Sequence, residues 1–566
     1  MYSEITGIVL MFGASLLLAI PLGKYIANVF AGHSTMLDRV MGPFEKLLFR
    51  VSGINATREM NWKQHMVAML CINLLWFLLG MFVLMNQRWL PLNPDANPDM
   101  SADLAFNTTI SFVVNCNLQH YSGETGLSYF GQLYLMFLQF VSAATGIAAA
   151  VVLFRALKEK ATHELGNFYV YFVKSITRIL LPLSIIVAIL FLLNGMPMGF
   201  EGKDSYTSLQ GDTVQVSRGP VAAFIPIKHL GTNGGGFFGA NSAHPLENPS
   251  YFTNIIQMIA QLIIPFSMIF AFGYFIKRKK LAWMIFGVMT VGFLLLAIPN
   301  IIQEINGNPA ITKMGINNSL GAMEGKEVRF GAAASGFWSI VTTVISTGSV
   351  NAMHDSTMPL SGMNEMLAMM VNSFYGGCGV GLLNFFIFII LAVFISGLMV
   401  GRTPEFMGKK IEAREIKIAM IIALLHPLLI LAGTALSSYM LVNNPEAYGG
   451  WLNNPGYHGF SEILYEYTSS AANNGSGFEG LGDNNLWWNI STGFVLIISR
   501  FLPIIGPVAI AGLLASKKHI PEGAGTLKTD TLTFGIMIFA VILIVTALSF
   551  FPSLALGPIA EFFTMN

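Results

Sequence analysis

Ten long apolar segments constrain this chain more than any other feature of its sequence. An α-helix needs roughly 20 apolar residues to cross the ~30 Å hydrocarbon core of a bilayer. Of the 566 residues, 54% are hydrophobic and only 11% are charged, whereas soluble domains carry about 25% charged residues. The sequence therefore predicts an all-α polytopic membrane protein. Its ten transmembrane helices are expected near 4–30, 65–86, 129–154, 172–194, 252–276, 281–302, 364–400, 417–441, 487–514 and 531–552.

Basic residues are concentrated in every second loop that connects these helices. They are frequent after the first, third, fifth, seventh and ninth segments, as in KRKK at 277–280 and at Arg402, and scarce in the longer loops between. Because Lys and Arg near helix ends stay on the cytoplasmic side, both termini are expected outside. The net charge of +1 without a basic face argues against a nucleic-acid partner. The three cysteines form neither a disulfide framework nor a CxxC metal pair.

Each of four outside loops contains an apolar run too short to span the bilayer. These runs are 101–114, 221–230, 333–345 and 459–470, and each precedes a polar stretch and then a full span. The repeated order predicts four pore repeats at 64–160, 170–280, 281–410 and 415–518, between extra helices at 1–30 and 530–566. Irregular backbone at membrane depth must be buried or line a wet cavity, so the four polar stretches are expected to share one pore. The C-terminal ends of four short helices pointing into it would stabilise a cation.

The four polar stretches contain amides, hydroxyls and glycines but no charged side chain at their centres. Such groups and backbone carbonyls replace the water shell of a weakly hydrated monovalent cation, as in potassium filters. Glycine allows the positive φ that turns successive carbonyls the same way. In the first loop, Gln119 is expected where the other loops have glycine. The predicted filter residues are Asn115, Cys116, Asn117, Gln119, Gly231, Thr232, Asn233, Gly234, Gly235, Ser346, Thr347, Gly348, Asn473, Asn474 and Gly475.

Several of these features allow a simpler interpretation. Clusters of Gly, Asn and Ser also form ordinary turns, although four in register favour a filter. The neighbouring histidines lack metal-ligand spacing, which favours polar packing; they are His120, His229, His244 and His354. The acids beyond the loop centres could concentrate cations at the mouth or simply be solvated; they are Glu124, Glu247, Asp355 and Glu479.

Two further features lie deeper in the predicted spans. The sequence GGCGVG at 376–381 interrupts the seventh segment, which makes Gly376, Gly377 and Gly379 candidates for a gate. A glycine kink for close packing is the alternative. Arg500 lies inside the ninth segment, where a charge is costly and is a functional candidate. It either faces the pore below the filter, where it would repel K⁺, or reaches towards the cytoplasmic surface.

With these features in place, the chain closely resembles the A subunit of the Kdp potassium-transporting ATPases. The matching stretches cover nearly the whole chain and include NCNLQHYSGETGLSYFGQ, GTNGGGFFGANSAHPLENPS, NAMHDSTMPLSG, GRTPEFMGKKIEAREIK and SAANNGSGFEGL. The resemblance implies a potassium-channel-like fold in the bacterial plasma (inner) membrane. It implies that K⁺ is bound at 115–119, 231–236, 346–349 and 473–476, and that Arg500 is the gating arginine. Thr347 departs from the Cys of some relatives.

The resemblance also implies how K⁺ transport is driven. In the family, K⁺ passes to a P-type ATPase partner, the B subunit, which hydrolyses ATP; the complex is completed by the C subunit together with a small single-span subunit. This chain has neither a DKTGT phosphorylation motif nor a GxxxxGK[ST] loop, so no nucleotide is expected on it. K⁺ as the transported ion and membrane lipids are its other expected partners. The alternatives are a stand-alone secondary potassium transporter and a non-transporting membrane scaffold.

Overall fold

The computed structural model describes residues 2–401, 403–521 and 528–565. Within them, ten helical stretches are long and apolar enough to cross a membrane, which confirms the predicted fold class. They contain α1 (Tyr2–Ala31), α3 (Trp62–Leu84), α6 (Tyr129–Lys158), α7 (Phe168–Ser175) with η1 (Ile176–Leu180) and α8 (Leu181–Leu193), α10 (Tyr251–Phe275), α11 (Lys279–Asn306), α15 (Val380–Val400), α16 (Ala413–Asn443), α19 (Leu486–Ala515) and α20 (Leu532–Leu554). The basic residue Arg402 lies outside the described residues.

Four short buried helices lie between these long ones, as the sequence predicts. They are α4 (Ala102–Val113), α9 (Val221–Leu230), α13 (Ala332–Val344) and α18 (Tyr457–Ala472). Every residue of α13 is buried, because the helix is surrounded by protein on all sides. Each short helix is followed by a loop and then by further helix, so the order helix, short helix, loop, helix occurs four times. Helix α1 packs along α10, and α20 packs against α11 and α15.

The seventh segment is broken into two helices. Helix α14 (Pro359–Val371) ends at Val371, and α15 begins only at Val380. Between them, Asn372, Tyr375, Gly376 and Gly379 have positive φ, a conformation that no α-helix contains. The predicted interruption is therefore confirmed, although α14 begins before the predicted start at 364.

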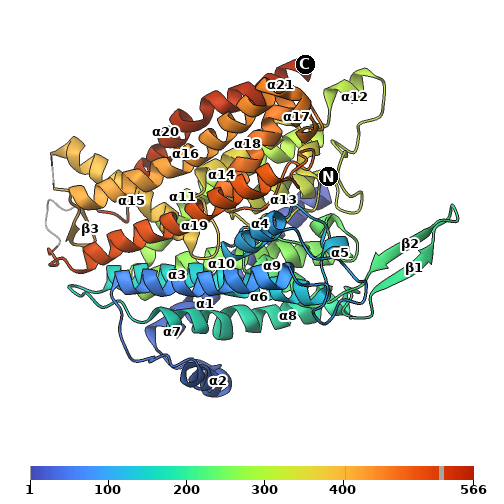
Figure 1. Ribbon diagram of the computed structural model, residues 1–566. Coiled ribbons are helices and arrows are strands. Elements are labelled where there is room, and N and C mark those ends of the chain that lie inside the picture. Colours follow the sequence, from blue (N-terminus) through green and yellow to red (C-terminus); the bar gives the residue numbers. More distant parts are fainter. Residues whose placement is uncertain (1, 402, 522–527, 566) are drawn as a thin grey trace.

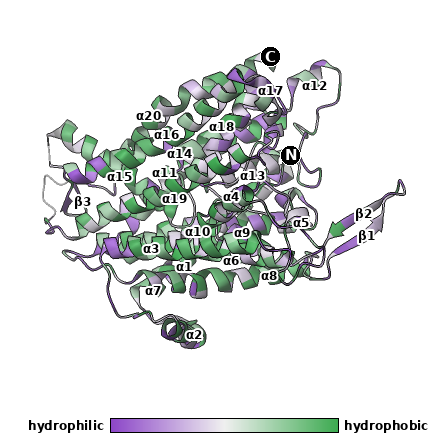
Figure 2. Ribbon diagram, viewed as in Figure 1, coloured by the Kyte–Doolittle hydropathy of each residue, from purple (hydrophilic) through white to green (hydrophobic). Residues whose placement is uncertain are grey.

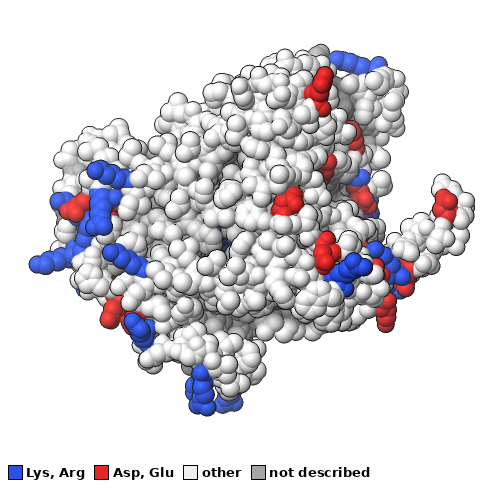
Figure 3. Space-filling model, viewed as in Figure 1, with Lys and Arg blue, Asp and Glu red and all other residues white. Residues whose placement is uncertain are grey.

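The long helices run side by side, and the chain begins and ends on the same side of the bundle (Figure 1). The long helices consist mainly of hydrophobic residues, while hydrophilic residues gather at the helix ends and in the loops (Figure 2). Lys and Arg cluster at the opposite end, near β3 (Glu405–Phe406) and β4 (Lys409–Lys410) (Figure 3).

The remaining elements are α2 (Asp38–Val51), α5 (Gly123–Gly126), β1 (Lys203–Thr207), β2 (Thr213–Ser217), η2 (Asn241–Ala243), α12 (Pro309–Lys313), η3 (His354–Ser356), α17 (Pro445–Tyr448), η4 (Gly449–Trp451), η5 (Ala555–Ile559) and α21 (Ala560–Met565). The strand pairs β1–β2 and β3–β4 are both antiparallel.

Candidate ion-binding site

The four loops after the short helices share one backbone conformation. In each loop, two residues with positive φ are separated by one residue without it. These pairs are Asn115 and Asn117, Thr232 and Gly234, Ser346 and Gly348, and Asn473 and Gly475. A non-glycine residue with positive φ is uncommon, so the same unusual turn in four separate places is a structural repeat. The structure thus aligns the four loops residue by residue, which their weakly similar sequences do not.

These loops interlock in a closed ring. At three of the four contacts, a Cβ added to the glycine of one loop would overlap a carbonyl oxygen of the next. The overlaps are Gly234 with Thr347, Gly348 with Asn474, and Gly475 with Cys116. The fourth contact is made by side chains: Asn115 Nδ2 donates to the carbonyl of Thr232 at 2.8 Å, and Gln119 Oε1 accepts from Gly236 N–H at 2.8 Å. Backbone carbonyls from all four quarters are therefore held around one axis.

The structure corrects the predicted place of Gln119. Asn117, with φ of 60°, occupies the position of Gly234, Gly348 and Gly475, and Gln119 lies two residues further along. The prediction was wrong because it looked for the missing glycine by residue type, whereas asparagine also tolerates positive φ. The Asn117 amide is buried, and neither its oxygen nor its nitrogen has a partner among the described residues. The first loop still differs from the other three, but the difference is that Asn117 takes the place of the glycine.

Most of the predicted amide ligands hold the ring from behind. Asn233 Nδ2 donates to the carbonyls of Gln139 and Ile227, at 3.3 and 3.2 Å. Asn474 Nδ2 donates to the carbonyl of Thr342 at 2.8 Å. Ser142 of α6 donates to Asn233 Oδ1 at 3.0 Å. Because these side chains are used in packing, the backbone carbonyls and the Asn117 amide are the polar groups that remain available at the ring.

A small cavity lies directly beneath the ring. The first residues of three loops line it together with Asn372, Asn384 and Arg500; those first residues are Asn115, Ser346 and Asn473. Arg500 is buried, and its Nη2 donates to the carbonyl of Ser142 at 3.2 Å. Of the two predicted placements, Arg500 therefore lies at this cavity and does not reach towards the cytoplasmic surface.

The break in the seventh segment reaches the same place. Gly377 lines the cavity, and Cys378 N–H donates to Thr232 Oγ1 of the second loop at 2.9 Å. A Cβ at Gly379 would overlap the carbonyl of Gly146 in α6. The sequence-predicted gate residues and the ring are thus brought together in space.

The histidines near the loops lie in separate hydrogen-bond groups. His120 Nδ1 lies 2.7 Å from Asn489 Oδ1, and His354 Nδ1 lies 2.8 Å from the Tyr465 hydroxyl. His229 Nε2 lies 3.0 Å from Ser349 Oγ, and the His244 ring stacks on Phe238. This is the polar packing that the sequence favours. Two of the four acids are not solvated: Glu247 is fully buried and paired with Lys228, and Asp355 is buried and paired with His458.

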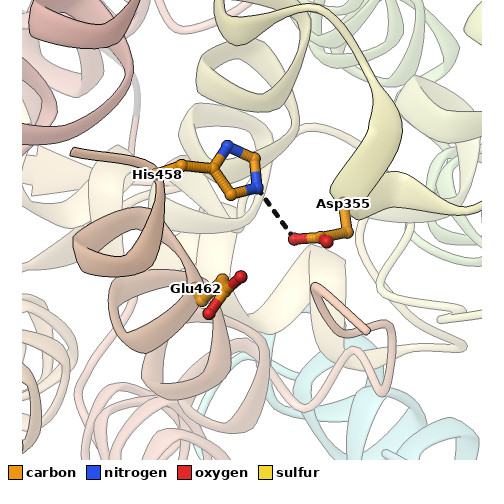
Figure 4. Close-up of side chains that lie close together, drawn as sticks. All are labelled: Asp355, His458 and Glu462. Carbon is orange, nitrogen blue, oxygen red and sulfur yellow. Dashed lines mark hydrogen bonds and ion pairs between the residues drawn. The ribbon is translucent and has the colours of Figure 1, made fainter. Parts of the chain in front are cut away.

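Sequence reasoning missed a cluster of ionisable side chains at the start of α18 (Figure 4). His458 Nε2 lies 2.9 Å from Asp355 Oδ1, and His458 Nδ1 lies 2.8 Å from Glu561 Oε1 of α21. Asn454 Nδ2 donates to Glu462 Oε1 at 3.1 Å. The spacing of His458 and Glu462, four residues apart on one helix face, was the available signal. Since both ring nitrogens face carboxylates, His458 ties the C-terminal helix to the segment after the third loop.

We expect this tie to weaken as the pH rises. Burial alone would lower the pKa of His458, but hydrogen bonds to Asp355 and Glu561 raise it to about 10. An unfolded histidine has a pKa of about 6.5. The stabilisation is therefore complete below about pH 6.5 and is lost as the pH rises through about 10. The melting temperature of the unaltered chain should exceed that of His458→Gln by about 3 °C or more at pH 6.5, and this margin should shrink towards pH 10.

The exposed His33 offers a matched control for this measurement. His33→Gln should melt like the unaltered chain at every pH. A margin for His458→Gln that stays constant up to pH 10 would contradict the ion-pair account.

Comparisons with known proteins agree with this architecture. The family model described as potassium-transporting ATPase A subunit matches residues 9–563. The potassium-transporting ATPase potassium-binding subunit of Flavobacterium johnsoniae is 70% identical to the chain over 100% of both proteins. The protein of that name in Geobacillus kaustophilus is 47% identical over 98% of both. Among solved structures, the potassium transporter TrkH of Vibrio parahaemolyticus has a similar fold, with a TM-score of 0.50 and 15% identity over 89% of this chain and 96% of that one.

Proposed function

Because the chain belongs to the family of the potassium-transporting ATPase A subunit, we propose that its ring of four loops is the K⁺ site of an ATP-driven uptake complex. As a member of this family, the chain is a multi-pass membrane protein that binds and transports K⁺. The observation that carries the assignment to the ring is the shared backbone turn of the four loops, whose glycines abut the carbonyls of their neighbours.

The chemistry of the ring suits a weakly hydrated cation. No residue at the loop centres is charged, so the ring would not hold a divalent ion by charge alone. The short helices end at the ring, and each C-terminal end contributes a partial negative charge. The carbonyls then replace the water shell of K⁺. The proposed ligands are the carbonyls of residues 115–117, 232–234, 346–348 and 473–475, with Gly231, Gly235 and Gln119 supporting them.

Below the ring, K⁺ would meet the positive charge of Arg500 and turn sideways. The cavity beneath the ring shares Asn372, Asn384 and Ser499 with a second cavity. This second cavity extends past His426 of α16 to Thr546 and Phe550 of α20. We place the exit towards a partner there, with Gly376, Gly377 and Gly379 as the candidate moving part.

The energy for uptake comes from another polypeptide in this proposal. The chain contains no nucleotide-binding or phosphorylation motif, so the B subunit, which is a P-type ATPase, would hydrolyse ATP. A small single-span subunit together with the C subunit would complete the complex, with membrane lipids around it. The bacterial source of the relatives supports a place in the bacterial plasma (inner) membrane, and the alternating basic loops favour both termini outside.

Reconstitution of the purified chain tests this proposal. Alone in liposomes, it should bind K⁺, seen as a K⁺-dependent rise in melting temperature that Na⁺ does not produce, without sustained K⁺ uptake. Uptake should require ATP and a co-purifying protein of P-type ATPase size. Sustained uptake by the chain alone would instead identify a secondary transporter, and equal responses to K⁺ and Na⁺ would exclude a K⁺ filter.

A further inference from the structure

Two of the four loops have a serine directly after the glycine of the ring. These are Ser349 and Ser476, whereas the matching residues of the other two loops are Leu118 and Gly235. Both serines are buried. Leu118 and Gly235 have no side-chain hydrogen-bonding group, so hydroxyl contacts at this position are confined to one half of the ring.

The hydroxyl of Ser476 is part of a continuous line of hydrogen bonds. It lies 2.8 Å from the hydroxyl of Tyr465 on α18, which lies 2.8 Å from His354 Nδ1. His354 belongs to η3, which follows the third loop, so the line joins the third and fourth repeats. Tyr465 is fully buried, and its ring stacks on Phe478 with the centroids 4.2 Å apart.

The line ends at a residue of the ring. Ser476 Oγ donates to Asn474 Oδ1 at 2.6 Å, and Asn474 Nδ2 donates to the carbonyl of Thr342 at 2.8 Å. The backbone carbonyl of Asn474 is the one against which Gly348 packs. A shift of the Ser476 hydroxyl would therefore be transmitted to a carbonyl of the ring.

The direction of these bonds is fixed along the whole line. Ser476 donates to Asn474, so Tyr465 must donate to Ser476 and His354 must donate to Tyr465. Burial lowers the pKa of His354 to about 3, which keeps its ring neutral with a single N–H, here at Nδ1. The Glu365 carboxyl group lies 3.7 Å from the same nitrogen, too far for a hydrogen bond. Hydrogen bonds aligned in one direction strengthen one another in a buried site.

We propose that Tyr465 and His354 are positioning residues that set the ion specificity of the ring by holding Asn474 through Ser476. The inference rests on the proposed K⁺ site. In it, Tyr465 and His354 decide the preference of that site for K⁺ over Na⁺. Na⁺ is smaller than K⁺ and needs the carbonyls to move closer together. A line of bonds that holds Asn474 in place resists this inward movement of its carbonyl and therefore disfavours Na⁺ relative to K⁺.

Tyr465→Phe in the assembled complex is the decisive variant, because it removes one hydroxyl and keeps the ring that stacks on Phe478. We expect the K⁺ concentration for half-maximal ATP hydrolysis to rise about fivefold, as the loss of one buried hydrogen bond implies. The preference for K⁺ over Na⁺ should fall by a similar factor. The maximal rate and the melting temperature should stay close to those of the unaltered complex.

Tyr467 on the same helix provides the matched control. It is equally buried, but its hydroxyl contacts Ser437 and Ser491, away from the ring. Tyr467→Phe should leave both ion affinity and preference unchanged. An unchanged K⁺ over Na⁺ preference in Tyr465→Phe, or an equal change in Tyr467→Phe, would overturn the inference.

Ser476→Ala keeps the test decisive if Tyr465→Phe does not assemble, since it cuts the same line one bond nearer the ring. Where both assemble, the double variant should be no worse than Ser476→Ala, because the two hydroxyls act in series. Gly348→Ala distinguishes a wrong K⁺ site from a wrong role of Tyr465 and His354. If it leaves K⁺ activation intact, the proposed site is wrong; if it alters K⁺ activation while Tyr465→Phe does not, only this inference fails.

Discussion

Replacing Gly348 with alanine should weaken the apparent K⁺ affinity of the assembled complex at least about 30-fold. Gly348 has a φ of 83°, where an L-residue costs roughly 1–2 kcal/mol. The added Cβ would also overlap the carbonyl oxygen of Asn474, so that carbonyl must leave its place in the ring. A loss of about 2 kcal/mol corresponds to about 30-fold in a binding constant. The K⁺ dependence of ATP hydrolysis and of uptake measures the effect.

Gly401 separates loss of the site from backbone strain alone. It has a φ of 67° directly after α15, and a Cβ there would meet no atom of the described residues within 4 Å. Gly401→Ala therefore carries the same backbone cost and should leave K⁺ affinity unchanged. Unaltered K⁺ affinity in Gly348→Ala, in a complex that assembles and melts normally, would remove the ring from consideration as the K⁺ site.

Replacing Arg500 with glutamine should open a K⁺ leak through the complex in the absence of ATP. Arg500 is buried beside the cavity below the ring, and it forms no ion pair within the described part of the chain. A unit positive charge about 7 Å from a K⁺ ion raises its energy by roughly 2 kcal/mol at an effective dielectric constant of about 20. Removing that charge should increase passive Rb⁺ flux in proteoliposomes about 30-fold.

Arg500→Lys keeps the charge while changing the shape of the side chain. It should leak far less than Arg500→Gln if charge is the barrier. Equal leaks in both variants would show that the geometry of the guanidinium, which donates to the Ser142 carbonyl, closes the path instead. No leak in either variant would mean that the barrier lies elsewhere, with Gly376–Gly379 the next residues to test.

The ten spans, the four short helices and the break in the seventh segment could all be predicted from the sequence. Hydrophobic length and glycine content are properties of a short stretch, and a bilayer responds to them wherever the stretch lies in the chain. The repeat of these features also predicted that four loops would meet. The candidate loops and Arg500 followed from the same local reasoning, because uncharged polar loops and a buried arginine are unusual inside apolar segments.

Contacts between distant segments decided the rest. The place of Asn117 in the ring could not be read from residue types, because asparagine and glycine both accept positive φ and only the neighbouring loops fix the alignment. The direction of Arg500 depends on how α19 is rotated against α6. The line from His354 through Tyr465 to Ser476 joins residues from two repeats, and His458 meets Glu561 more than 100 residues away in the chain. The sequence by itself thus determined which segments are long and apolar enough to enter the membrane and which loops meet in the ring, since these depend on local composition. Only the tertiary structure decided which atoms hold the ring in place, since those bonds exist only when remote helices pack together.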